Sequence, residues 1–439
     1  MYMFISLVFI IFLIVIATTN FKIHPFLSLL FAALIMGFIS GMDSSDIIKK
    51  MTEGFGKTLS NIGIIIAFGT IIGAYLEKSG GAIQIARSVL KTIGEKKSAL
   101  AMNLTGFFVS IPVFCDSGFV ILSPLNKALS KKSGIPLVVF AISLAAGLYA
   151  THVFVPPTPG PLAAAAALKA DLGLVILLGL IVALPVSLTG YFWAKFIGKK
   201  VNLVEKDKIK IEEEPNKLPG NIVSFAPILV PIILIAFKSM ADYPTQPFGS
   251  NLLYQILIFI GNPVISLLIG VLLAFALKQN TIDSHFDWIA KGLKEAGVII
   301  FITGAGGAFG TILRSGGIGD IIGSSLSDFQ VGILLPFILA AVLKSAQGSS
   351  TVAIITTAAI ISPLLEPLGL SSEINKALTV LAIGAGAMTV SHLNDSYFWV
   401  VAQFSDMDTA TALKSHTMAT LLQGMTGITI VYLLYLFIG

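Results

Sequence analysis

A series of short sequence motifs occurs twice in the chain, about 240 residues apart. The stretch AAGLYATH, which ends at His152, resembles AGAMTVSH, which ends at His392. Three more pairs keep the same order: Gly69/Gly73 with Gly306/Gly310, Ser79-Gly80-Gly81 with Ser315-Gly316-Gly317, and Ser123-Pro124-Leu125 with Ser362-Pro363-Leu364. In a membrane protein, two related halves are typical of a transporter whose substrate site lies where the halves meet.

The composition predicts an all-α polytopic membrane protein. Hydrophobic residues make up 55% of the chain and charged residues 12%, whereas a soluble domain carries about 25% charge. Several apolar stretches approach the roughly 20 residues of a bilayer span. They are Met3–Ile16, Phe26–Ile39, Ile62–Leu76, Leu172–Trp193, Ile222–Phe237, Leu252–Leu277, Val298–Leu313 and Met418–Ile438. The net charge of +5 lies in cytoplasmic-type loops, so we expect no nucleic-acid partner.

Lysines and acids orient two hairpins. The apolar run Ala99–Leu129 is too short for two crossings, and lysines flank it, so a re-entrant hairpin with a cytoplasmic base is predicted. The matching run at 331–365 is flanked by acids, which predicts an external base. Those acids are Asp320, Asp328, Glu366 and Glu373. Equivalent hairpins of opposite orientation predict two inverted-topology repeats.

Each repeat is expected to hold about five transmembrane helices, one re-entrant hairpin and one broken helix. The first repeat spans 1–198, with its hairpin at 99–129 and its broken helix at 135–168. A cytoplasmic linker, 199–221, joins it to the second repeat, 222–439, with a hairpin at 331–365 and a broken helix at 376–404. Both termini are predicted outside, and the amphipathic segments Ala82–Lys91 and His285–Lys294 are predicted to lie along the membrane surface.

Polar residues interrupt apolar stretches at four places, where irregular backbone needs surrounding protein or a water-filled cavity. The first interruption is Pro112–Gly118 and contains Asp116, Ser117 and Gly118. A lone carboxylate at membrane depth costs several kcal/mol unless it is protonated or paired, which favours a functional role for Asp116. A structural role as a helix N-cap is the alternative.

The second interruption, His152–Pro161, holds four prolines and cannot be continuous helix. A simple kink would need only one proline. We therefore predict a broken crossing in which Gly160 and the helix N-terminus beyond it offer backbone N–H groups to an anion.

The third interruption, Lys344–Thr351, forms the tip of the second hairpin. Gly348, Ser349, Ser350 and Thr351 are suited to hold a carboxylate or hydroxyl groups at a helix start. Two readings of Lys344 stay open: it offsets the substrate's charge, or it snorkels or pairs with a nearby acid.

The fourth interruption runs from Ser391 to Trp399 and matches the second. Asn394, Asp395 and Ser396 offer donors and acceptors for hydroxyl groups. His152 and His392 occupy matching positions in the two repeats and are candidate proton carriers. Duplication also preserves histidines that serve only packing.

Other functional classes find little support. Gly56-Lys57-Thr58 resembles the end of a phosphate-binding loop, but Met51 stands where that loop needs glycine. No Cys/His cluster has metal-site spacing and no catalytic constellation is present, so we expect no metal, no cofactor and no enzyme activity. An ion gradient, of protons or of sodium, is the expected energy source. A channel is disfavoured because polar residues are confined to the central interruptions.

Together the four interruptions resemble the gluconate permease family of the ion-transporter superfamily. The resemblance covers nearly the whole chain. The motifs that carry it are Phe114–Val120, His152–Pro161, Ala346–Ala353 and Ser391–Asp395. It implies a multi-pass protein of the bacterial inner membrane that imports sugar acids or related hydroxy acids, mostly with protons. It further implies a homodimer in which a transport domain moves against a scaffold, as in an elevator.

The four interruptions supply the residues to which we assign roles. Asp116, Asp395, His392 and His152 are the candidates for proton coupling. The expected substrate contacts are Ser117, Gly118, Thr158, Gly160, Lys344, Gly348, Ser349, Ser350, Thr351, Asn394 and Ser396. Members of the family commonly place histidine between the prolines, where this chain has Thr158, so a hydroxy acid other than gluconate, or D-serine, is an alternative substrate. A sodium-coupled carboxylate transporter is the nearest rival.

Overall fold

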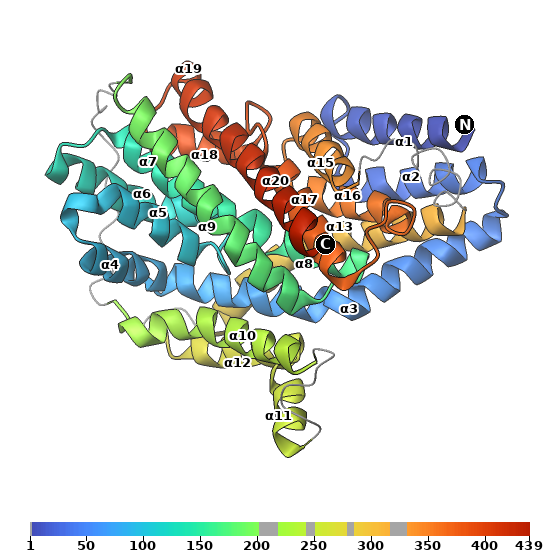
Figure 1. Cartoon of the computed structure of the whole chain (residues 1–439), viewed down its shortest axis with the longest axis horizontal. Coiled ribbons are helices and arrows are strands. Elements are labelled where there is room, and N and C mark those ends of the chain that lie inside the picture. The colour runs from blue at the N-terminus through green and yellow to red at the C-terminus, as the bar shows by residue number, and fades with distance from the viewer. Residues whose placement is uncertain (1, 202–217, 243–250, 279–284, 317–331) are drawn as a thin grey trace.

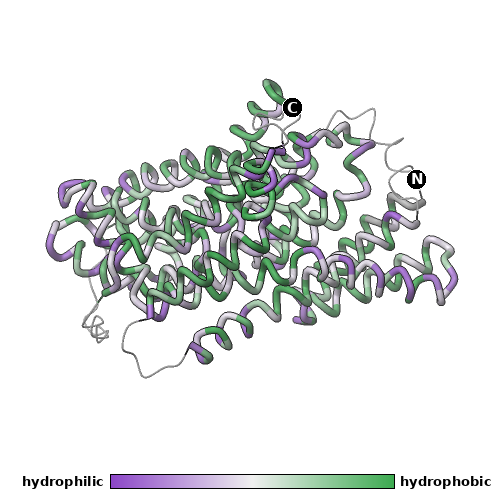
Figure 2. Tube along the Cα trace, turned by 90° about the horizontal axis from the view of Figure 1, so that it is seen from below, coloured by the Kyte–Doolittle hydropathy of each residue, from purple (hydrophilic) through white to green (hydrophobic). Residues whose placement is uncertain are grey.

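Every element in the described part of the chain is helical (Figure 1). The computed structural model describes residues 2–201, 218–242, 251–278, 285–316 and 332–439. Within these residues, six helices are long and apolar enough to cross a membrane, or seven if one bent pair is a single span. Figure 2 shows hydrophobic residues along the long helices and hydrophilic residues gathered towards helix ends and connections. The predicted all-α polytopic membrane fold is confirmed.

The two halves follow the same order of elements: initial helices, one very long helix, a hairpin, a broken crossing and a last helix. The first half contains α1 (Tyr2–Thr19), α2 (Pro25–Ile39), α3 (Ser44–Lys78), α4 (Gly81–Ile93), α5 (Ser98–Val109), α6 (Cys115–Ser133), α7 (Leu137–Phe154), α8 (Pro159–Leu168) and α9 (Leu172–Ile197). The second contains α10 (Asn221–Ala241), α11 (Leu252–Ile260), α12 (Pro263–Phe275), α13 (His285–Ser315), α15 (Leu334–Gln347), α16 (Ser350–Ile361), α17 (Glu373–Met388), α18 (Ser396–Phe404), α19 (Thr409–Ala412) and α20 (Met418–Ile438).

Some sequence-based predictions fall outside the described residues. Most of the predicted linker 199–221 lies there, as do Asp320, Asp328 and the first residue of the hairpin at 331–365. The repeat boundaries at 198 and 222 therefore stay predictions. The hairpins themselves are formed by α5 with α6 and by α15 with α16, and the broken crossings by α7 with α8 and by α17 with α18.

The longest helices, α3 and α13, pack along each other. The predicted surface helix His285–Lys294 is wrong, because this segment is the first part of the continuous α13. Its residues are anchored on α3: Trp288 is buried against the ring of Tyr75, with 5.0 Å between centroids, and Lys291 pairs with Glu77 at 2.5 Å. These contacts give the polar side chains of this segment partners within the protein, so the segment does not need to lie at a membrane surface.

The apolar stretch Leu252–Leu277 is not one straight helix, because α11 and α12 meet at a bend of 66°. Pro263 has no N–H to continue the α11 ladder. The Asn262 side chain accepts a hydrogen bond from the backbone N–H of Val264 at 3.0 Å and so starts a new helix.

Helix α7 lies at the centre of the fold, and all of its residues are buried. Buried amides tie its neighbours to it: the Asn103 side chain donates to the carbonyls of Ser143 and Ser187, and Gln423 donates to those of Ala146 and Val186. Because these amides bond to backbone carbonyls, they link helices α5, α7, α9 and α20 through hydrogen bonds inside the fold.

The paired glycines of the long helices face the hairpins and the first break. A Cβ on Gly73 of α3 would lie 2.5 Å from the carbonyl oxygen of Pro112, and one on Gly69 would lie 3.3 Å from that of Pro157. On α13, Gly306 similarly approaches Ile355 of α16. The prediction of close helix packing is confirmed. Small residues thus form the contact between the α3–α13 pair and the hairpins.

Candidate functional site

Four helices begin at the four interruptions: α6, α8, α16 and α18. They pair across the two halves, since α6 packs against α18 and α16 packs against α8. The second arm of each hairpin therefore lies beside the second part of the other half's broken crossing. This exchange brings the candidate residues of both halves into one region.

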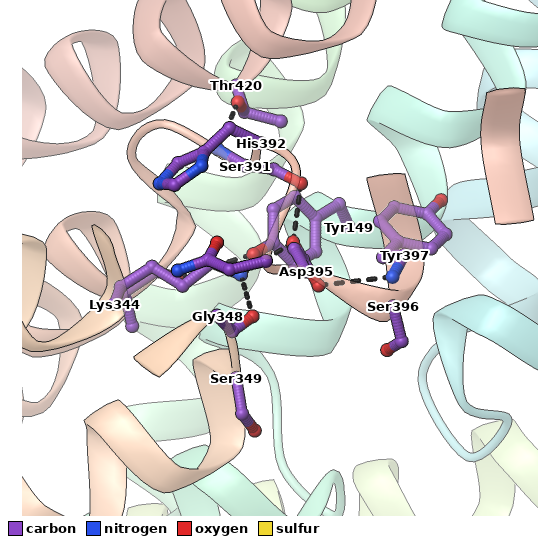
Figure 3. Close-up of polar contacts among 12 residues, drawn as sticks. Tyr149, Lys344, Gly348, Ser349, Ser391, His392, Asp395, Ser396, Tyr397 and Thr420 are labelled. Atoms are coloured by element: carbon purple, nitrogen blue, oxygen red, sulfur yellow. Dashed lines mark hydrogen bonds and ion pairs between the residues drawn. The ribbon is translucent and has the colours of Figure 1, made fainter. Parts of the chain in front are cut away.

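Among the candidate site residues of the second half, Lys344 and Asp395 form a buried ion pair (Figure 3). The Nζ of Lys344 lies 2.5 Å from Oδ2 of Asp395, and the two side chains are 1% and 6% exposed. Lys344 also donates to the carbonyl of Gly348, and Ser391 donates to the same carboxylate. Of the two readings left open for Lys344, the structure shows the pairing with an acid.

Asp395 is also the N-cap of α18. Its Oδ1 accepts a hydrogen bond from the backbone N–H of Tyr397 at 3.0 Å. A carboxylate at the N-terminus of a helix is stabilised by the free N–H groups and by the helix dipole. Asp395 thus joins the hairpin tip, the break and the start of α18 in one set of hydrogen bonds.

Residues at the start of α20 and just before it form hydrogen bonds to Ser391 and so support the hydrogen bonds around Asp395. Nε2 of His416 lies 3.2 Å from Oγ of Ser391, while Thr417 and Thr420 bond to the Ser391 backbone at 2.6 and 3.0 Å. None of the three partners of Ser391, which are His416, Thr417 and Thr420, lies at a helix-breaking residue, so the search for interruptions missed them. The polar run Ser415–Thr417 at the start of the last apolar stretch is the signal that would have found them.

The break at 389–395 also caps the first arm of the hairpin. The Asn394 side chain donates to the carbonyls of Ser345 and Ala346 at 2.8 and 3.1 Å, and Nε2 of His392 lies 3.0 Å from the Ser345 carbonyl. These carbonyls belong to the last turn of α15, which lacks helical partners. Asn394 and His392 therefore hold the hairpin tip to the break.

Gly348 is the point of closest approach between tip and break. Its φ is +81°, and a Cβ there would lie 2.0 Å from the carbonyl oxygen of Asn394. We expect Gly348→Ala to lower the free energy of unfolding by about 2 kcal/mol or more, through backbone strain and the clash together. Thermal unfolding of the purified protein measures this.

Gly134→Ala is the matched control for Gly348→Ala. Gly134 also has a positive φ, +70°, but an added Cβ meets nothing within 4 Å. This variant carries the backbone strain without the clash. Equal loss of stability in the two variants would show that the approach to Asn394 is not important.

Asp116 lies at the other side of the region, in the first turn of α6. Its Oδ1 accepts a hydrogen bond from Ser396 at 3.4 Å, which links the first hairpin to the second break. The N-cap of α6 is Phe114, so Asp116 does not serve the capping role that was its structural alternative. Among the described residues, no basic side chain forms an ion pair with Asp116.

Other first-half candidates lie in packing contacts. Thr158 is buried, and its hydroxyl donates to the Val155 carbonyl at 2.5 Å. A Cβ on Gly160 would lie 2.8 Å from Ile354 of α16. His152 is buried beside Phe114, with 6.1 Å between ring centroids. These residues shape the first break, and their functional roles stay predictions.

The remaining candidates lie at the starts of α6 and α16. Ser349 is the N-cap of α16 and accepts a hydrogen bond from the N–H of Val352 at 3.3 Å. Ser350 and Thr351 form the first turn of the same helix. Ser117 and Gly118 lie in the first turn of α6, where Gly118 packs on Leu148. Hydroxyl side chains thus lie at the starts of these two helices, and substrate contact stays a prediction.

Comparisons with known proteins agree over the whole chain. A model of the GntP family permease matches residues 1–437. A gluconate permease of Pseudomonas aeruginosa is 37% identical over 96% of this chain and 95% of its own length. The inner membrane permease YgbN of Escherichia coli is 35% identical, covering 94% and 93%. The Gnt-II system L-idonate transporter of the same organism is 31% identical, covering 95% of both chains.

A solved structure shares the fold. The YdaH transporter of Alcanivorax borkumensis matches with a TM-score of 0.64 at 13% identity, over 95% of this chain and 99% of that one. At this identity the match supports the fold alone. The full-length family match, with relatives at 31–37% identity, establishes more: the chain belongs to the GntP permease family and is a multi-pass transporter of a bacterial membrane rather than an enzyme.

Proposed function

We propose that this transporter imports gluconate or a closely related sugar acid by proton symport. One relative is named for gluconate and another for L-idonate, and both substrates are six-carbon polyhydroxy acids. The observation that carries the proposal is the convergence of α16 and α8 from opposite halves, with hydroxyl side chains at the start of α16.

The charge balance of the region favours binding of the carboxylate by backbone groups. Lys344 is already neutralised by Asp395, so the pair presents little net charge to a substrate. The first turn of α16 carries the N–H groups of Ser350 and Thr351 without helical partners, and that of α8, where residues 159 and 161 are prolines, adds the N–H of Gly160; these groups suit a carboxylate. The side chains of Ser350, Thr351 and Ser396 are then available for the substrate's hydroxyl groups.

Asp116 is the candidate that best fits proton coupling. Asp395 is held by Lys344, Ser391 and its capping bond, and His392 is bound to the Ser345 carbonyl. Asp116 has weaker partners, a Ser396 hydroxyl and the Cys115 thiol at 3.8 Å. Because an unpaired carboxylate is costly at membrane depth, a proton on Asp116 would ease the movement of the loaded site.

The proposed movement is of the elevator type in a homodimer. The glycine-lined contacts of α3 and α13 with the hairpins leave a smooth surface along which a transport unit can slide. The exposed apolar residues of α11 fit either lipid or a second copy of the chain. They include Leu252, Leu253, Ile256 and Phe259.

Uptake of labelled gluconate into proteoliposomes tests the proposal. We expect accumulation under an inward proton gradient, and none when sodium replaces it. L-Idonate and D-serine, added in excess, serve as competitors. Accumulation driven only by sodium would contradict proton symport, and failure of any sugar acid to enter or compete would contradict the substrate class.

A further inference from the structure

A cleft separates the α3–α13 pair from α8 and α16, and three basic residues line it. Lys57 comes from α3, Arg314 from the end of α13, and Lys169 directly follows α8. The residues that line this cleft include no Asp or Glu. Three cations from three separate elements therefore share one opening without an acid between them.

An adjoining pocket shares Lys169 and Arg314 with this cleft and also contains Glu366 and Lys376. In the part of the chain that the structure describes, none of the three cations of the cleft forms an ion pair. Arg314 donates to the hydroxyls of Ser362 at 2.7 Å and Thr311 at 3.3 Å. Both partners are neutral, and they fix the guanidinium at the opening while leaving other N–H groups free for an anion.

The cleft leads toward the candidate site. Its walls on α8 are small side chains, Ala163, Ala166 and Ala167, and on α16 they include Ile355. Ala163 is one helical turn beyond Gly160, and Ile355 is five residues beyond the start of α16, distances of about 5 and 8 Å along the helix axes. The inner end of the cleft thus lies close to the two helix N-termini that are proposed to bind the carboxylate.

The position of these cations is unusual for a membrane protein. In the predicted topology, α8, α13 and α16 all end on the external side, where lysine and arginine are depleted relative to the cytoplasmic side. Topology therefore does not account for basic residues at this opening. A converging set of unpaired cations creates a local field that concentrates anions.

We propose that Lys57, Lys169 and Arg314 form an anion-binding vestibule that captures the substrate's carboxylate before it reaches the hairpin tips. This inference rests on the proposed function, in which the substrate is a small hydroxy carboxylate. The vestibule raises the local concentration of the anion, whereas the hairpin tips hold it during transport.

The kinetic test uses Lys57→Gln, Lys169→Asn and Arg314→Gln in proteoliposomes. Asparagine replaces Lys169 because this residue has a φ of +54°, a left-handed conformation that asparagine tolerates. We expect each to raise KM for gluconate roughly two- to fivefold, as for a partly exposed charge, with an unchanged maximal rate and a weaker dependence on salt. Arg314→Lys should retain a low KM. Lys238→Gln is the control, since Lys238 is paired with Asp242 outside the cleft. KM values equal to that of the control would overturn the vestibule.

A labelling test does not depend on transport. The cysteine of Ala166→Cys, in the cleft wall, should react several-fold faster with an anionic methanethiosulfonate than with a cationic one, and Arg314→Gln should reduce that preference. Ser45→Cys, between Asp43 and Asp46 on α3, is the control and should show no such preference. The wild type, whose single cysteine is buried, is the blank.

The two tests separate the two proposals. A preference for the anionic reagent in a protein that carries no sugar acid would support the vestibule and reject the proposed substrate. Gluconate transport with no preference at Ala166→Cys and no change in KM would reject the vestibule alone.

Discussion

Replacing Lys344 with methionine is expected to abolish transport and to lower the free energy of unfolding by about 3–5 kcal/mol. The substitution leaves Asp395 buried without its cation, at 6% side-chain exposure. It also removes a donor to the Gly348 carbonyl, so the hairpin tip loses its bond to the break. The cost arises mainly from the uncompensated carboxylate and not from the lost attraction.

Thermal unfolding of the purified protein and uptake in proteoliposomes measure the two effects. Lys127→Met is the matched control, because Lys127 pairs with Asp406 at 2.7 Å with side chains 16% and 14% exposed. We expect it to cost about 1 kcal/mol, since water and salt weaken a partly exposed pair.

A double substitution separates the pair's charge from its packing. Lys344→Met with Asp395→Asn should recover much of the lost stability, because asparagine still caps α18 and no charge remains buried. Transport should stay low in this variant if the pair also holds the hairpin. A Lys344→Met protein as stable as Lys127→Met would contradict the buried pair.

Asp116→Asn is expected to abolish uphill accumulation of substrate while preserving exchange of labelled for unlabelled substrate. Asparagine keeps the size and a hydrogen bond to Ser396 but cannot take up and release a proton. Exchange needs only binding and movement of the loaded site, whereas accumulation needs the coupled proton.

Counterflow and gradient-driven uptake in the same proteoliposomes distinguish these steps. Glu95→Gln is the control, because Glu95 is an exposed acid beside the same hairpin and pairs with Lys132 at 2.6 Å. It should leave both activities intact. Accumulation at the wild-type level in Asp116→Asn would assign coupling to another group, with His392 and His152 next in order.

Much of the architecture was predictable because it depends on local patterns. The run of apolar stretches requires membrane helices, and the lysine-flanked segment that became α5 and α6 is too short to cross twice. The prolines between His152 and Pro161 forced a break between α7 and α8 wherever the rest of the chain lay. Each of these features acts through neighbouring residues alone.

The error in the helices came from a contact that no local pattern contains. The polar face of His285–Lys294 suggested a membrane surface, but Lys291 finds Glu77 on α3, so the helix continues without interruption. Hydropathy alone did not reveal the bend within Leu252–Leu277. There the signal was present, since Asn262-Pro263 is a helix start, but the surrounding apolar residues hid it.

The sequence by itself determined the membrane class, the repeated order of elements and the four interruptions, because composition and chain stiffness act over a few residues. Only the tertiary structure decided how the interruptions meet. Lys344 and Asp395 are 51 residues apart, and α6 packs on α18 and α16 on α8 from opposite halves. A buried charge needs a partner, but which partner it finds depends on how distant helices pack, and no single segment of the chain encodes that choice.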